Sequence, residues 1–503
     1  MLIHQILEYT AGRLPDKTFL LEDERGLTYA QVLARSRALA AALEARGVGQ
    51  GERVALLFPN GIDFCLAYFA VLSLGAVVVP LNNRLAPQEL AYILEDSQAG
   101  TLILEQQFWP AWQALAGLLG RAPRLILAGG RQAGVEDFAT LCQPGPEPAA
   151  RPILEPASPA SVMYTSGTTG KPKGAILSHG NVFTNARNAG AHLGYKQSDV
   201  TLLVVPLFHV TGLHSQLVAF CYVGGTCVLM RSYNTAAMIE LMARHRVTVT
   251  FKVPTMYTLM LVNPALAHSD LSGLRLAAYG GAPMAPETIR QLQDRLGVDL
   301  CNCYGLTEAT SLVTVLPACD ALRKAGSIGL ATSGTRLRVV DEAGDDLPPD
   351  SVGELLIKAP IVVRGYWNKP RATALNIVDG WLHTGDYARM DPEGFVYIAD
   401  RKKDMIIRGG ENIYSIEVES ALVSHPKVLE AAVVPRPHSI FDEVVHAFVV
   451  LNQGTDCGEE EIIADYKVPA SVSFVIELPR NPGGKVLKNR LREMVPPGDP
   501  PRR

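Results

Sequence analysis

The stretch Tyr-Thr-Ser-Gly-Thr-Thr-Gly-Lys-Pro-Lys-Gly, residues 164–174, decides how the rest of the chain is organised. It holds three glycines, four small hydroxyl side chains and two lysines, with apolar residues on both sides. Such a segment has almost nothing apolar to bury in a core. Glycines let backbone N–H groups approach phosphate oxygens, hydroxyls donate hydrogen bonds, and lysines add positive charge. The composition predicts a loop that wraps a phosphate, although a solvated turn is the commoner role of a short glycine cluster.

The P-loop of nucleotide hydrolases is the first alternative for this segment. That motif needs Gly-x-x-x-x-Gly-Lys followed by Ser or Thr. Here Gly170 and Lys171 are followed by Pro172, which has no hydroxyl for magnesium and no backbone N–H. The P-loop is therefore excluded.

The length and composition limit the classes of protein to which the chain can belong. A chain of 503 residues is too long for one ordinary core, so two or more domains are expected. The 46 Lys and Arg nearly balance the 50 Asp and Glu, so nucleic acid is not expected as a partner. The eight cysteines contain no Cys-x-x-Cys pair, which favours reduced thiols in a cytoplasmic protein without a zinc site.

No membrane helix is expected. The N-terminus lacks the basic start and apolar run of a signal peptide, and it reads as a short amphipathic helix. The most apolar stretch near it, 65–81, is broken by Gly75 and Pro80 and is shorter than a bilayer span. We expect a buried helix that leads into a buried strand there.

Strands alternate with helices through most of the chain. Apolar spacing predicts helices over 28–47, 61–75, 86–96, 212–224, 235–245 and 285–296. Short apolar runs predict strands over 54–59, 76–81, 101–104, 161–164, 201–205, 226–230 and 248–252. This alternation is typical of an α/β fold, with parallel-type sheets flanked by helices.

The pattern of predicted elements changes after about residue 325. Short β-like runs at 335–341, 352–358 and 395–398 predict a small β-layer. The charged run 401–404 is then followed by a new series of strand, loop, helix and strand, which suggests a linker. We expect a large N-terminal body, 1–402, and a smaller α+β C-terminal domain, 403–503.

Residues 165–174 resemble, at every position, the phosphate loop of the adenylate-forming enzymes. These include acyl-CoA synthetases, the adenylation domains of peptide synthetases and firefly luciferase. The resemblance runs from about Thr28 to Arg492. It implies that ATP activates a carboxylic acid, a reaction between two anions whose charge the protein must neutralise.

The resemblance assigns roles to residues along the chain. It implies a phosphate-binding loop made of Thr165, Ser166, Gly167, Thr168, Thr169, Gly170, Lys171 and Lys173. Tyr304-Gly-Leu-Thr-Glu308 would supply an aromatic face for adenine, Thr307 near the α-phosphate, and Glu308 as a Mg²⁺ ligand, with Thr165 beside the metal. A helix N-cap is the alternative role for Thr307. The remaining nucleotide-binding candidates are Gly281, Ala282, Pro283, Asn302, Asp386 and Arg401.

The C-terminal domain would supply the catalytic Lys485, which bridges the carboxylate and the α-phosphate. In the family this domain is mobile and turns about a hinge, which matches Lys403 here. Gly409 and Gly410 would then line the channel for the pantetheine arm of CoA. His209 would gate the acyl carboxylate, and a buried structural histidine is the equal alternative.

The resemblance implies an acid–thiol ligase that makes acyl-AMP from a small carboxylic acid and ATP, then acyl-CoA. Two alternatives stay open: an enzyme that loads a carrier protein, and a catalytically silent nucleotide-binding protein. The positions expected to line the acyl pocket are small or neutral: Val210, Thr211, His214, Cys303, Thr310 and Ser311. No arginine is among them to bind a second carboxylate, which predicts a monocarboxylic acid, fatty or aromatic. The sequence does not determine which acid is the substrate, whether the protein forms a homodimer, or what effect an unusually short segment at 459–469 has.

Overall fold

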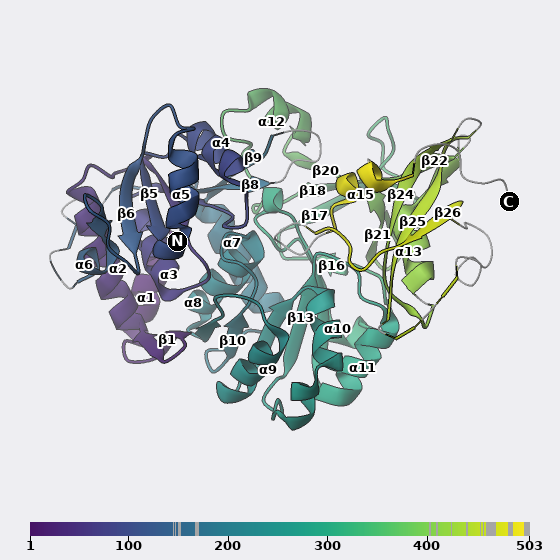
Figure 1. The fold of residues 1–503 in the computed structure, drawn as a ribbon, viewed down its shortest axis with the longest axis horizontal. Helices are drawn as coiled ribbons and strands as arrows, with labels where there is room; N and C mark the ends of the chain where they lie inside the picture. The colour runs from purple at the N-terminus through teal and green to yellow at the C-terminus, as the bar shows by residue number, and fades with distance from the viewer. Residues whose placement is uncertain are drawn as a thin grey trace.

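The computed structural model describes residues 1–503 except 144, 146, 149–151, 166–170, 402–403, 409–410, 424, 439–440, 453, 456, 459–468, 481–485 and 497–503. Two large sheets with their helices form the N-terminal body, and a third, smaller sheet joins it to the C-terminal domain (Figure 1). The predicted α/β architecture is confirmed.

The predicted phosphate loop lies between two strands of a seven-stranded sheet, whose order is β7-β6-β5-β3-β4-β8-β9. All neighbours are parallel except the β8/β9 pair, which is antiparallel. The strands are β3 (Arg53–Leu57), β4 (Val77–Pro80), β5 (Thr101–Glu105), β6 (Arg124–Ala128), β7 (Glu136–Asp137), β8 (Pro159–Thr165) and β9 (Lys173–Ser178). The helices of this part are α1 (Ile3–Arg13), α2 (Tyr29–Glu44), α3 (Ile62–Ser73), α4 (Pro87–Ser97), α5 (Trp109–Ala116) and α6 (Phe138–Leu141).

The second sheet has nine strands in the order β16-β15-β14-β13-β12-β10-β11-β1-β2. Its centre is parallel as predicted, but both of its ends are antiparallel, which the alternation pattern missed because hairpins close the sheet there. The strands are β1 (Thr18–Glu22), β2 (Arg25–Thr28), β10 (Val200–Leu203), β11 (Thr226–Leu229), β12 (Val249–Lys252), β13 (Leu276–Gly280), β14 (Asp299–Tyr304), β15 (Thr314–Leu316) and β16 (Leu330–Ala331). Its helices are α7 (His179–His192), α8 (Ala219–Val223), α9 (Thr235–Arg244), α10 (Pro254–Val262) and α11 (Pro286–Leu296).

The helix predicted over 212–224 begins as a π-helix, Thr211–Val218, and continues as α8. Gly212 explains why this start packs so closely on the end of β10. A Cβ atom at Gly212 would lie 2.6 Å from the carbonyl oxygens of Val205 and Pro206, so any other residue would clash there. π-Helical turns occur frequently at functional sites.

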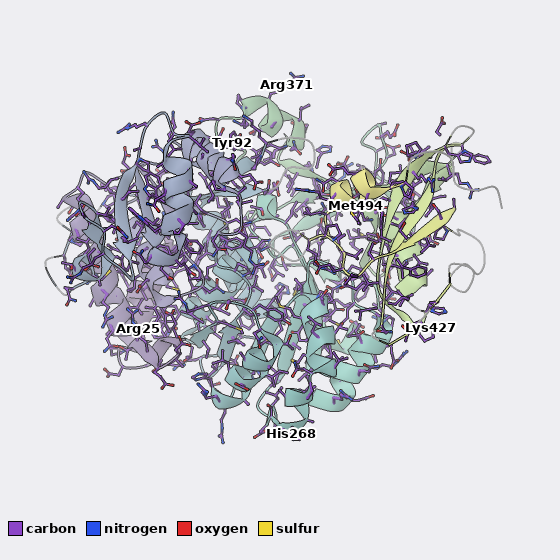
Figure 2. The ribbon with its side chains drawn as sticks, in the orientation of Figure 1. Arg25, Tyr92, His268, Arg371, Lys427 and Met494 are labelled. Atoms are coloured by element: carbon purple, nitrogen blue, oxygen red, sulfur yellow. The ribbon has the colours of Figure 1, made fainter. Side chains whose placement is uncertain are left out.

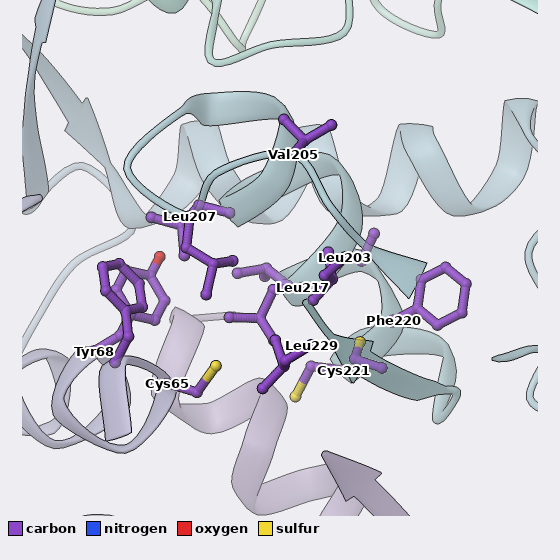
Figure 3. Packing of buried hydrophobic residues seen from close by; sticks show 14 of the residues in the cluster. Cys65, Tyr68, Leu203, Val205, Leu207, Leu217, Phe220, Cys221 and Leu229 are labelled. Carbon is purple, nitrogen blue, oxygen red and sulfur yellow. The ribbon is translucent and has the colours of Figure 1, made fainter. Parts of the chain in front are cut away.

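Helix α3 lies in the middle of the largest core, where it packs against the second sheet. Cys65 and Tyr68 of α3 lie close to Leu207 and the strands β10 and β11 (Figure 3). Every residue of α3 from Phe64 to Leu72 is buried, as expected for a helix that is apolar on all sides. The apolar run 65–81 is therefore a core helix and a strand; no helix among the described residues could span a membrane.

The predicted small β-layer is a five-stranded antiparallel sheet that follows the second sheet in the chain. Its strands are β17 (Arg336–Val340), β18 (Gly353–Lys358), β19 (Ile377–Val378), β20 (Trp381–Met390) and β21 (Val396–Arg401), and α12 (Pro370–Asn376) precedes β19. The segment 381–386, which contains Asp386, lies in the long strand β20, and the sequence pattern predicted no strand there.

The C-terminal domain, as far as the structure describes it, combines a fourth sheet with the helices α13 and α15. Its elements are β22 (Ile406–Arg408), β23 (Glu411–Ile413), α13 (Ser415–Val423), β24 (Val428–His438), β25 (Asp442–Leu451), β26 (Ser471–Phe474) and α15 (Lys488–Met494). The shortened segment falls largely outside the described residues. The boundary at 402/403 and the mobility of the domain stay predictions.

Candidate functional site

The predicted phosphate loop connects β8 and β9, two neighbouring antiparallel strands. Thr165 at the end of β8 is paired with Lys173 at the start of β9, and its hydroxyl lies 3.4 Å from the Lys173 carbonyl oxygen. The sheet therefore holds both ends of the loop in register. Five loop residues lie outside the described residues, so their phosphate contacts stay predictions: Ser166, Gly167, Thr168, Thr169 and Gly170.

Both loop lysines lie over aromatic rings. The Nζ atom of Lys171 is 4.9 Å from the ring centroid of Tyr92, and that of Lys173 is 4.8 Å from the ring of Tyr366. A cation over an aromatic face is attracted by the ring quadrupole but keeps its full charge. The two ammonium groups are thus held at the loop, and no carboxylate of the described residues forms an ion pair with either of them.

Tyr366 joins the phosphate loop to the predicted metal ligand. Its hydroxyl donates a 2.9 Å hydrogen bond to Oε1 of Glu308, while its ring carries Lys173. The segment around it pairs with β9, because Trp367 N–H donates to the Gly174 carbonyl at 2.7 Å and Ile176 N–H donates to the Gly365 carbonyl at 3.0 Å. Burial and the nearby Glu308 carboxylate raise the pKa of Tyr366, so its phenol stays a donor.

The turn from Tyr304 to Ser311 presents Thr307 and Glu308 beyond the carboxyl end of β14. Gly305 is required there, because a Cβ atom would lie only 1.2 Å from the Ser311 carbonyl oxygen. Thr307 starts the 3₁₀ turn Thr307–Ala309, and the capping position is occupied by Leu306. The N-cap alternative for Thr307 is therefore wrong.

Glu308 fits a site for Mg²⁺. Among the described residues no group of three or more His, Cys, Asp or Glu side chains could hold a metal by itself. Mg²⁺ usually binds one or two carboxylates, and substrate phosphates and water complete its shell. A single oriented carboxylate next to the phosphate loop matches that pattern.

The predicted ribose and adenine residues form one cluster. Asp386 on β20 lies opposite Arg401 on β21, with Arg401 Nε 3.4 Å from Asp386 Oδ1. The Tyr304 hydroxyl donates a 2.6 Å hydrogen bond to Oδ2 of the same carboxylate. Burial and the Asp386 carboxylate raise the pKa of Tyr304, so the phenol remains protonated.

The other nucleotide-binding candidates lie at the ends of the central strands. Gly281, Ala282 and Pro283 are exposed just after β13. Asn302 is buried in β14, where its side-chain amide donates a 2.8 Å hydrogen bond to the Ser327 carbonyl. The first three are open to a ligand, whereas the Asn302 side chain already has a partner in the core.

His209 is exposed just before the π-helix, and its Nδ1 lies 3.3 Å from the Thr211 N–H. The alternative role as a buried structural histidine is therefore wrong for His209. It applies instead to His214, which is fully buried. Burial lowers the pKa of His214 to about 3, so the ring is neutral.

Several predicted acyl-pocket positions lie together in a chain of neutral polar groups. Ser311 Oγ is 2.9 Å from Ser215 Oγ and 3.5 Å from Thr211 Oγ1. Asn185 on α7 extends this chain through a 3.2 Å contact with Ser215. Ser215 and Asn185 were not predicted, because nothing in their local sequence marks them. The contacts join hydroxyls and an amide, without a charged group.

The predicted residues that depend on domain movement, Lys403, Gly409, Gly410 and Lys485, lie outside the described residues. The described part of the C-terminal domain contacts the body beside the expected hinge. Asp400, at the end of β21, accepts a 3.0 Å hydrogen bond from the Ser415 hydroxyl. Farther away, Thr255 Oγ1 on α10 lies 3.5 Å from Oε1 of Glu430 on β24.

Two family models match this chain. The model of the AMP-binding enzymes matches residues 7–367, and that of the AMP-binding enzyme C-terminal domain matches residues 417–485. The chain is 37% identical over 502 residues to an indoleacetate–CoA ligase of Aromatoleum aromaticum, covering 98% of each chain. It is 38% identical to a feruloyl-CoA synthase of an Amycolatopsis species, covering 95% of this chain and 96% of the other.

A solved structure extends this likeness to the fold. The anthranilate CoA ligase AuaEII in complex with anthranoyl-AMP superposes with a TM-score of 0.93 at 29% identity, covering 98% of this chain and 97% of that chain. The two family models cover both the body and most of the C-terminal domain. The chain therefore belongs to the AMP-binding enzyme family, and within it to the AMP-forming acyl-CoA synthetases.

Proposed function

We propose that this enzyme activates an aromatic or fatty monocarboxylic acid in two steps. The acid carboxylate attacks the α-phosphorus of ATP, and pyrophosphate leaves to give acyl-AMP. The CoA thiol then loses its proton and attacks the acyl carbon, forming a thioester while AMP departs. The observation that supports this most is the meeting of Lys173 and Glu308 at Tyr366, from three distant parts of the chain.

The first step brings two anions together, so positive charge must be in place before they meet. Lys171 and Lys173 provide ammonium groups at the phosphate loop, and Arg401 provides a guanidinium beside Asp386. Glu308 would hold Mg²⁺, which supplies charge neutralisation at the phosphate oxygens when bound. Lys485 would approach the carboxylate and α-phosphate from the C-terminal domain.

The nucleoside half would be held by the cluster of Tyr304, Asp386 and Arg401. The Asp386 carboxylate can accept hydrogen bonds from ribose hydroxyls, and its link to Tyr304 fixes its orientation. Binding energy from this remote half of ATP would serve to align the α-phosphate for attack.

The second step needs room for a thiol arm. Gly409 and Gly410 would line that passage once the C-terminal domain has turned about Lys403. His209 is suited to gate the carboxylate, since its ring is exposed next to the π-helix. ATP and CoA are thus both substrates of the proposed enzyme.

An aromatic acid is the favoured substrate. The polar chain of Thr211, Ser215 and Ser311 is uncharged, which suits a ring with neutral polar substituents better than a second carboxylate. Two relatives and a structural neighbour are named for aromatic acids, namely indoleacetate, ferulate and anthranilate, while other relatives are named for long-chain fatty acids.

The test is a panel of acids assayed for ATP-dependent pyrophosphate release, with and without CoA. Aryl acetates, cinnamates, benzoates, fatty acids and dicarboxylates form the panel. We expect an aryl monocarboxylate to give the highest kcat/KM, with formation of the thioester and AMP in equal amounts. Preference for a dicarboxylate would contradict the pocket argument.

Two further results would favour the alternatives. Acyl-AMP formation without thioester on CoA, but with transfer to a phosphopantetheinylated carrier protein, would indicate a carrier-loading enzyme. ATP binding without pyrophosphate release for any acid would indicate a silent nucleotide-binding protein.

A further inference from the structure

The carboxylate of Asp96, near the end of α4, joins segments that frame the phosphate loop. Its Oδ2 accepts a 2.8 Å hydrogen bond from the Tyr164 hydroxyl, and its Oδ1 forms an ion pair with Lys369. Only 8% of the Asp96 side chain is exposed. Tyr164 directly precedes the loop, and Lys369 follows the Tyr366 segment that holds Glu308. One buried carboxylate therefore connects the start of the loop to the proposed metal ligand.

The far end of the loop is reached by Tyr92, one helical turn before Asp96 on the same face of α4. Its hydroxyl lies 3.3 Å from the Pro172 carbonyl oxygen and 3.4 Å from Asp96 Oδ1, and it can donate to one of them at a time. Its ring carries the Lys171 ammonium at 4.9 Å. Figure 2 labels Tyr92 at the same side of the molecule as α12, which follows Lys369.

The network is strong because its acceptor is charged and largely screened from water. Hydrogen bonds to a carboxylate are about twice as strong as neutral ones. Lys369 balances the charge of Asp96, so the carboxylate does not repel a nearby triphosphate. The hydrogen bond with Asp96 raises the pKa of Lys369, and burial together with Asp96 raises that of Tyr164. Each donor therefore keeps its proton at neutral pH.

We propose that Asp96 is a positioning residue for ATP. It holds Tyr164 at one end of the phosphate loop and the Tyr366–Lys369 segment beside the other, and its helix supplies the Tyr92 ring under Lys171. Asp96 itself does not touch the nucleotide. The inference rests on the proposed function, in which this loop binds the triphosphate.

The variant Asp96→Asn tests this role. It keeps the size of the side chain and an oxygen that can accept from Tyr164, but it removes the charge that holds Lys369. We expect the Kd for ATP in the presence of Mg²⁺, and the KM for ATP, to rise about tenfold, while the KM values for acid and CoA change less than about twofold. Asp294→Asn is the matched control, since Asp294 is exposed on α11, which lies well away from β8 and β9 in Figure 1.

Tyr92 gives a second, independent test. Tyr92→Phe keeps the ring under Lys171 and should raise the KM for ATP less than Tyr92→Leu, which removes it. In the double variant Tyr92→Leu with Lys171→Met, the rise in the KM for ATP should be clearly smaller than the product of the rises in the two single variants. Both substitutions remove the same contact, that between the ring and the ammonium group. Multiplicative losses would show that the ring does not act through Lys171.

The outcomes separate this inference from the proposed function. Absence of acid-dependent pyrophosphate release and thioester formation in the wild-type enzyme would overturn the proposed function. Equal ATP affinity in the wild type and Asp96→Asn, or equal increases in all three KM values, would overturn the positioning role. A lower kcat with unchanged ATP affinity, as a merely destabilised protein would give, would also overturn it. Direct ATP binding needs no knowledge of the acid.

Discussion

The Tyr366 hydroxyl donates a 2.9 Å hydrogen bond to Oε1 of Glu308, so a side chain beside the phosphate loop orients the proposed metal ligand. The Tyr366 ring holds Lys173 at the same time. One aromatic residue thus contacts both the lysine proposed to bind phosphate and the carboxylate proposed to bind the metal. Substitutions at this residue should therefore affect metal and nucleotide together.

The variant Tyr366→Phe should raise the Mg²⁺ concentration that gives half-maximal rate. Phenylalanine keeps the ring under Lys173 but removes the donor that orients Glu308, so kcat/KM for ATP should fall about tenfold. Steady-state rates measured over a Mg²⁺ titration check this. Tyr9→Phe is the control, because Tyr9 is exposed on α1; unchanged Mg²⁺ dependence in Tyr366→Phe would refute the link.

The variant Asp386→Asn should weaken recognition of ribose. A hydrogen bond to a charged acceptor contributes roughly 1.5–3 kcal/mol, so kcat/KM for ATP should fall about 10- to 100-fold. The loss should be much smaller with 2′-deoxy-ATP or 3′-deoxy-ATP, because these lack a hydroxyl that Asp386 would bind. The comparison of the three nucleotides is the measurement. Asp379→Asn, at an exposed turn before β20, serves as control, and equal losses for all three nucleotides would exclude a ribose contact.

The variant Lys485→Ala should separate the two half-reactions. Loss of this ammonium should reduce acyl-AMP formation by several hundredfold or more, about 4 kcal/mol of charge stabilisation. Thioester formation from preformed acyl-AMP should change little. Single-turnover assays of each half-reaction measure the two rates, with the exposed Lys196→Ala as control. Equal loss of both rates would refute the role assigned to Lys485.

The buried Lys252 should make the stability of the body depend on pH. Its Nζ contacts Thr250 Oγ1, the Met242 sulfur at 3.5 Å and the Tyr257 ring at 5.0 Å. Burial lowers the pKa of Lys252 from 10.5 to about 7. Between these two values the unfolded chain binds a proton that the folded protein has released, so this lysine makes stability rise with pH in that window.

The variant Lys252→Met should therefore stabilise the protein, by roughly 1–3 kcal/mol at pH 7, since the ammonium no longer has to be desolvated. Its Tm should depend less on pH between about 7 and 10 than that of the wild type. Thermal melts at one scan rate over this range are the measurement, with Lys196→Met as control. A lower Tm at pH 7 would mean that contacts of the ammonium outweigh its desolvation.

Much of the fold could be predicted from the sequence alone. The uninterrupted apolar run of α3 fixed a buried helix, and the alternation from α2 to β12 predicted the parallel centre of both large sheets. These features follow from local periodicity, which the chain carries in short windows. The strand β20 was missed because its polar residues and Gly385 break that periodicity.

The sequence by itself also determined which candidate groups the site contains, because its motifs place lysines, hydroxyls and a carboxylate suited to anions and a metal in short, recognisable strings. Tertiary structure alone decided how those strings meet. No local sequence motif identifies Tyr92, Asp96 or Tyr366. Their roles come from contacts with residues about 60 to 80 positions or more away in the chain. The physical reason is that each residue carries its own side-chain chemistry, whereas the distances between side chains depend on sheet pairing and core packing over the whole body.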